Sequence, residues 1–177
     1  LLLSLPPDSD GTEAEALANL AERAPEFDLG SLLFAEHMEA RLGRRATVNV
    51  WLPDTGPDWE LKMELGDADL EILLAYKLKR NWQADLRLIA RVTEEEEAFR
   101  ARAYLDELMD LARLPSSEAV VLTGELDSAL SQSPLADLHF FPLPTGLDNC
   151  APLARRRDAL QSSCVFVRAA GPESALA

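Results

Sequence analysis

The fold of this chain is limited most strongly by its short apolar runs, in which hydrophobic and polar residues do not alternate. Two of them read VVLTG, over residues 120–124, and CVFVR, over residues 164–168. A strand that is covered on both faces has no solvent side, so it needs no alternation. Segments with helical spacing of apolar residues separate these runs. The pattern predicts an α/β fold with a mainly parallel sheet and helices on both faces, which makes three layers.

The boundaries of the expected elements follow from this pattern and from the residues that stop helices. Strands are predicted over residues 1–5, 29–35, 46–52, 86–92, 119–123, 138–141 and 164–168. Helices are predicted over residues 10–24, 67–82, 93–113, 126–132 and 147–161, with a helix or turn over 37–43 and a loop over 53–57. Pro25 and Pro115 end the first and third helices, because proline removes a backbone donor and clashes with the preceding turn.

The starts of two helices carry side chains that can cap them. Asp67 or Asp69 is expected to cap the second helix, because its carboxylate can accept from a free backbone N–H. Thr93 and Glu96 have the spacing of a capping box. The glutamates at 94–97 complement the positive end of the same helix dipole.

The length and charge of the chain narrow its class. With 177 residues, the chain is long enough for a hydrophobic core, so residues 1–177 are expected to form one domain. Its formal net charge of −14 repels nucleic acid and anionic lipid, so neither is expected as a partner. No apolar run approaches the roughly 20 residues that a membrane-spanning helix needs. Because the chain lacks an initial methionine, we expect it to be a piece of a longer protein.

Catalytic and metal-binding chemistry finds little support in the sequence. The histidines are His37 and His139, and the cysteines are Cys150 and Cys164. A zinc site needs three or four close ligands, which these residues do not supply. A Cys–His pair needs both groups within hydrogen-bond reach, and the sequence leaves this open. We therefore assign no catalytic residue, no metal ligand and no cofactor, and we expect a protein that is not an enzyme, in a compartment where its cysteines stay reduced.

A parallel sheet raises the question of a nucleotide site, because ligands bind at the carboxyl ends of such strands. The sequence contains neither G-x-G-x-x-G nor G-x-x-x-x-G-K-[ST]. Gly124 ends a strand, but Glu125 follows it and would repel a phosphate. Nucleotide binding remains an alternative, although the sequence contains neither of these phosphate-binding motifs.

The residues that we single out lie on and around the second helix. Leu70, Leu73, Leu74, Lys77 and Leu78 share one helix face that is expected to meet the core, so Lys77 would have to extend its amine to solvent.

Lys77, Lys79, Arg80 and Trp82 form a basic cluster at the end of that helix. Cations there also stabilise the helix dipole, so a purely structural role stays open. An acidic partner surface, such as residues 94–97 of another subunit, is the alternative. Trp51 and Trp59 flank a proline-rich loop and would mark an interface if they were exposed.

Residues 46–92 resemble the cytosolic C-terminal domain of cation-chloride cotransporters. There a V-x-V-W strand precedes a D-L-x-L-L-x-A-Y-x-L-x-R-x-x-W helix, and a strand similar to L-R-L-I follows. The matching residues here are Val48, Val50, Trp51, Asp69, Leu70, Leu73, Leu74, Ala75, Tyr76, Leu78, Arg80 and Trp82. Leu52 stands where vertebrate members have a second tryptophan, so the likeness is to prokaryotic members.

The resemblance implies a regulatory and dimerising domain on the cytoplasmic side of a membrane transporter of the amino acid–polyamine–organocation superfamily. It implies a fold similar to universal stress proteins. The implied partners are a second copy of the domain and the transmembrane domain of the same polypeptide. The residues that carry transport would lie outside this chain.

Two other classes remain open. A free-standing module similar to universal stress proteins would bind a nucleotide or another small ligand, and would need a phosphate loop. A small hydrolase would need an activated serine or cysteine in a pocket.

Overall fold

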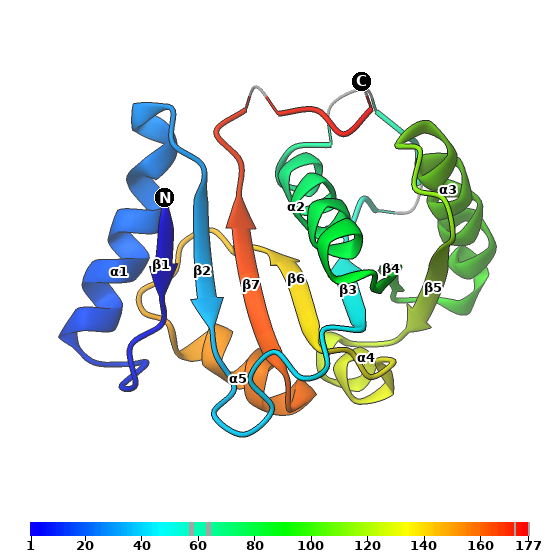
Figure 1. The fold of residues 1–177 in the computed structure, drawn as a ribbon. Coiled ribbons are helices and arrows are strands. Elements are labelled where there is room, and N and C mark those ends of the chain that lie inside the picture. The colour runs from blue at the N-terminus through cyan, green and yellow to red at the C-terminus, as the bar shows by residue number, and fades with distance from the viewer. Residues whose placement is uncertain (57–58, 63–64, 172, 177) are drawn as a thin grey trace.

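The computed structural model describes residues 1–56, 59–62, 65–171 and 173–176 of the chain. Its centre is a seven-stranded sheet with helices on both faces (Figure 1). The strands are β1 (Leu2–Ser4), β2 (Ser31–Ala35), β3 (Thr47–Trp51), β4 (Asp85–Val92), β5 (Ser117–Thr123), β6 (Leu138–Pro142) and β7 (Ser163–Arg168). The helices are α1 (Thr12–Arg23), α2 (Asp67–Trp82), α3 (Ala98–Leu111), α4 (Leu126–Gln132) and α5 (Ala151–Leu160). The expected α/β class with a mainly parallel sheet is confirmed.

The order of the strands across the sheet is β1-β2-β7-β6-β3-β4-β5. All neighbours are parallel except β2 and β7, which pair in antiparallel register from Ser31–Arg168 to Ala35–Cys164. The last strand is therefore inserted between the first two strands and the other four. In Figure 1, β2 points down and β7 points up at this junction.

Two hydrophobic clusters hold the helices to opposite faces of the sheet. On the face with α2 and α3, the buried residues include Val48, Leu88, Ile72 and Leu105. The opposite face packs against α1, α4 and α5, and its cluster includes Phe166. Burial on both faces explains the run CVFVR, because β7 is buried along its whole length. The prediction was wrong for the run VVLTG, because β5 is an edge strand and its residues 120–123 are only partly buried.

The inward face of α2 differs from the predicted face. Its buried residues are Ala68, Asp69, Glu71, Ile72 and Ala75. The predicted stripe is rotated away from the sheet: Leu73 is 41% exposed, and Lys77 is exposed as well. Small and β-branched residues make the close contact with the strands, and Leu74 and Leu78 lie at the border between core and surface.

Two capping predictions are wrong in detail. The first helical residue of α2 is Asp67, and its N-cap is Gly66, which has a positive φ of 65° and no side chain to cap with. Asp69 reaches back instead and accepts from the backbone N–H of Leu65 at 2.7 Å. Thr93 caps no helix in the described part of the chain, because a 3₁₀ turn (Glu95–Glu97) precedes α3 and closes through backbone groups.

The remaining boundaries agree with the predictions to within a few residues. The helix predicted over 147–161 is shorter, because it begins only at Ala151, where Pro152 occupies the first turn. The helix or turn predicted over residues 37–43 is a series of turns over residues 38–44, and Pro57, in the predicted loop, lies outside the described residues. Within the described part of the chain, no helix has the length and apolar character needed to cross a membrane.

Candidate functional site

The end of α2 presents the basic cluster to solvent, but its members differ in role. Lys77 and Arg80 are exposed, and Trp82 is half-buried. The guanidinium carbon of Arg45 lies 5.9 Å from the centroid of the Trp82 ring, a distance typical of a cation–π contact. Gln83 ends the helix in a left-handed conformation. Lys77, Arg80 and Trp82 are named the α2-end surface below.

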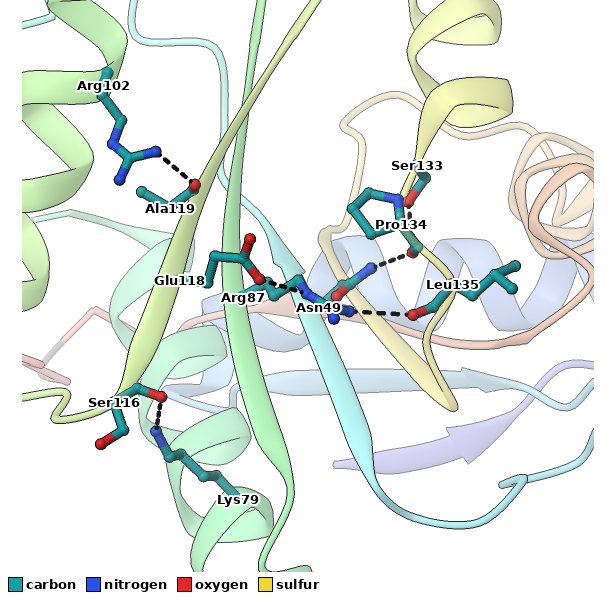
Figure 2. Close-up of polar contacts among 10 residues, drawn as sticks. All are labelled: Asn49, Lys79, Arg87, Arg102, Ser116, Glu118, Ala119, Ser133, Pro134 and Leu135. Carbon is teal, nitrogen blue, oxygen red and sulfur yellow. Dashed lines mark hydrogen bonds and ion pairs between the residues drawn. The ribbon is translucent and has the colours of Figure 1, made fainter.

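Lys79 is bound into the fold and is not part of the α2-end surface. Its Nζ donates to the carbonyl oxygens of Pro115 and Ser116 at 2.6 and 3.0 Å, and to Ser117 Oγ at 3.1 Å. Figure 2 shows the bond to Ser116. Partial burial lowers the pKa of Lys79, and the nearby Asp85 carboxylate opposes that shift. Lys79 thus anchors the end of α2 to the start of β5.

Trp51 and Trp59 are core residues, with exposures of 3% and 5%. The Trp51 ring stacks on Phe141 with ring centroids 5.2 Å apart, and its Nε1 donates to His139 Nδ1 at 3.2 Å. The Trp59 ring packs edge-on against Tyr104 at 5.6 Å. The two tryptophans would mark an interface only if they were exposed. Because both rings are buried, they cannot contact a partner.

His139 and Cys164 are register partners on β6 and β7, so they are the pair to compare with a Cys–His site. Burial lowers the pKa of His139 to about 4, with a smaller contribution from the positive charge of Arg87. Burial raises the pKa of the Cys164 thiol far above its usual range. Both groups are therefore neutral, whereas an activated pair needs a thiolate. The Cys164 thiol donates to the Ser162 carbonyl oxygen at 3.6 Å rather than to the imidazole.

A polar row that was not predicted continues from His139 across the same face of the sheet, the face away from α2. Asn49, Arg87 and Glu118 are cross-strand neighbours on β3, β4 and β5. Asn49 Nδ2 donates to the Pro134 carbonyl oxygen at 2.8 Å, and Arg87 donates to the Leu135 carbonyl oxygen at 3.2 Å (Figure 2). Arg87 Nε also pairs with Glu118 at 2.8 Å.

This row fastens the segment after α4 to the sheet. Without its two bonds, the carbonyl oxygens of Pro134 and Leu135 would need other donors. The alternation of polar with apolar residues in β3 and β4, such as Asn49 between Val48 and Val50, was the signal available in the sequence. Asn49 Oδ1 is buried and has no hydrogen-bond partner among the described residues.

The carboxyl ends of β3, β4 and β5 are linked by Arg91. Its guanidinium pairs with Asp54 at 2.8 Å and donates to the Gly124 carbonyl oxygen at 3.2 Å. A phosphate at this position would face the carboxylate of Asp54 rather than free amide donors. This edge therefore gives no support to a nucleotide site.

A second unpredicted feature joins the start of α2 to the C-terminal segment. Asp67 Oδ1 accepts from the Ala169 N–H at 2.7 Å, and Asp69 Oδ1 accepts from the Ala175 N–H at 2.6 Å. Glu71 lies one turn further on, with 0% exposure and no partner for either carboxylate oxygen among the described residues. Burial, and to a lesser extent the Asp67 charge, raises the pKa of Glu71 well above its usual value.

The described ranges contain no cluster of metal-ligating side chains. They contain no group of three or more histidine, cysteine, aspartate or glutamate side chains that could hold an ion. The site residues thus comprise one exposed surface at the end of α2 and several buried polar contacts that hold the fold together.

Comparison with known proteins identifies the family. Residues 43–176 match the family described as the second C-terminal domain of prokaryotic cation-chloride cotransporters. A crystal structure of the cytoplasmic domain of a prokaryotic cation chloride cotransporter superposes with a TM-score of 0.88 and 34% sequence identity. The match covers 99% of this chain but only 66% of the solved chain. No curated protein sequence matches.

Both findings agree with the resemblance noted for residues 46–92, and with the cytoplasmic location that it implies. The family match spans well over half of the sequence and includes all the strands from β3 onward. The chain therefore belongs to the family of the second C-terminal domain of prokaryotic cation-chloride cotransporters.

Proposed function

We propose that this chain is a non-catalytic regulatory and dimerisation domain of a secondary transporter that moves cations together with chloride. Family membership is the observation that carries the proposal. The chemistry of the described site residues agrees with it, because His139 and Cys164 are both held in neutral, buried forms.

The proposed role is mechanical. The domain biases transport by docking to a second copy of itself and to cytosolic loops of the transporter. A single sheet with helices on both faces is a rigid platform for such contacts, and a partner that prefers one conformation shifts the population toward it. The α2-end surface, Lys77, Arg80 and Trp82, is proposed to meet an acidic partner surface, because positive and negative patches attract across an interface.

The dimerisation part of this proposal is tested by sedimentation equilibrium of the 177-residue chain over a wide concentration range. A dimer whose fraction rises with concentration is the expected result. A monomer at all concentrations would remove dimerisation from the role of this segment. The alternative, a free-standing ligand-binding module, is tested separately with adenine nucleotides.

A further inference from the structure

The sheet face beside α2 contains an apolar groove that no described helix fills. In Figure 1, α2 and α3 lie in front of one half of the sheet, while β1 and β2 have no helix in front of them. The groove has a volume of about 420 Å³. Leu2, Leu32 and Phe34 form its floor on the sheet, and Leu74 and Trp82 form its wall on α2.

The exposure of these residues shows that the groove is open to solvent. Leu2 on β1 is 70% exposed, although β1 is a strand of the sheet. Leu32, Phe34 and Leu74 are only partly buried, although they contact the hydrophobic core. A contiguous exposed apolar surface on a folded domain marks a docking site, whereas single scattered leucines do not.

The position of the groove fits a helix. The layer that contains α2 and α3 stops at α2, and the groove is the next position in that layer. A helix laid beside α2 would bury the front of β1 and β2 and complete the layer. Its contact residues would recur at i, i+3, i+4 and i+7, as in other helices that bind in grooves.

The charges around the groove restrict the partner. Among the described residues that line it, Lys77 is the only charged one, and none is acidic. Arg45 adds a second positive charge over the Trp82 ring. This cationic rim stands out on a chain whose formal net charge is −14.

A second copy docked through the same face would be disfavoured by these charges. A two-fold symmetric contact brings the same patch of both copies together, so Lys77 and Arg45 would face their own equivalents. We propose that the groove binds an amphipathic helix from outside residues 1–177, with an apolar face and carboxylates along one edge. This inference rests on the proposed function.

The experiment uses the 177-residue chain and two synthetic amphipathic helical peptides of about 18 residues, roughly five turns. Both peptides carry leucines on one face. One has glutamates along the edge of that face, and the other has lysines at the same positions. Because Trp51 and Trp59 are buried, tryptophan emission that changes with peptide reports on Trp82, and Trp82→Phe is the control for this assignment.

The glutamate peptide is expected to bind and to shift the tryptophan emission to the blue. The lysine peptide is expected to bind at least about ten-fold more weakly, because its charges do not complement those of the groove. The double variant R45E/K77E should reverse this preference. The matched variant Arg100→Glu, which changes an exposed charge on α3, should leave both affinities unchanged.

Equal binding of the two peptides, or binding of neither, would overturn the inference. The same samples are examined by sedimentation equilibrium, which separates this failure from that of the proposed function. A dimer that persists in R45E/K77E, alongside the reversed peptide preference, supports both proposals. A dimer that R45E/K77E alters would make the groove a contact between copies, which refutes the helix but retains dimerisation.

Discussion

Asp69 on α2 accepts a hydrogen bond from the backbone N–H of Ala175, 2.6 Å away, and so ties the first turn of a central helix to the C-terminal segment. The other oxygen of Asp69 accepts from the Leu65 N–H at 2.7 Å. A buried carboxylate with two charge-assisted bonds is a strong junction, because its removal leaves two donors unpaired.

The variant Asp69→Ala is therefore expected to lower the free energy of unfolding by about 2–4 kcal/mol, from two lost bonds of about 1–2 kcal/mol each. Chemical denaturation measures this change. Asp110→Ala is the control, because Asp110 is exposed and makes no side-chain hydrogen bond in the described structure. Its free energy of unfolding should be close to that of the unmodified chain. Equal, small effects of both variants would show that the C-terminal segment does not depend on Asp69.

Glu71 gives the chain a specific dependence of stability on pH. Burial raises its pKa in the folded state well above 4.5, so the folded form is protonated at pH values where the unfolded form is ionised. Unfolding then releases a proton, and the free energy of unfolding falls as pH rises from about 4.5 toward the folded pKa. The contribution of one proton is at most about 1.4 kcal/mol per pH unit.

The variant Glu71→Gln should remove this slope, because the amide does not titrate. Denaturation midpoints between pH 5 and 8 measure it, and Glu107→Gln, at an exposed position on α3, should retain the slope of the unmodified chain. A slope that persists unchanged in Glu71→Gln would contradict the assignment of a neutral carboxyl at this position.

Two lysines on the same helix are expected to differ in their contribution to stability. Lys79→Met removes a donor that serves three acceptors near Pro115, so it should cost about 1–2 kcal/mol. Lys77→Met removes an exposed amine from the rim of the groove and should change stability by less than about 0.5 kcal/mol. Thermal unfolding compares the two, and a larger loss for Lys77 would reverse the roles given to them.

Adenine nucleotides should leave the melting temperature of the chain unchanged at millimolar concentration. Arg91 is already paired with Asp54 at the carboxyl ends of β3, β4 and β5, where a phosphate would otherwise bind. A ligand that binds only the folded state must raise its stability, so a concentration-dependent increase in melting temperature would favour the ligand-binding alternative.

The sequence predicted the local structure of this chain better than its long-range contacts. The non-alternating apolar runs led to the sheet, and proline positions placed the helix ends, because both depend on neighbouring residues. The insertion of β7 between β2 and β6 could not be predicted, since strand order depends on contacts between distant segments. The contacts of Asp69 with Ala175 and of Asn49 with Pro134 were missed for the same reason.

The candidate surface was predicted in part. Spacing brought Lys77, Lys79, Arg80 and Trp82 to one helix end, but it could not show that Lys79 is used internally. Burial of Trp51 and Trp59 follows from the layers on each side of the sheet, which periodicity alone does not reveal. The groove depends on the open space in front of β1 and β2, where no described helix lies, and this is a property of the assembled layers.

The proposed regulation of transport by this domain is measured as chloride-dependent cation uptake. Cells or vesicles containing the full-length transporter are compared with those containing a version that lacks this domain, at equal amounts in the membrane. A changed uptake rate together with a changed oligomeric state is the result that the proposed role requires. Uptake and oligomeric state that are both unchanged by the deletion would contradict it.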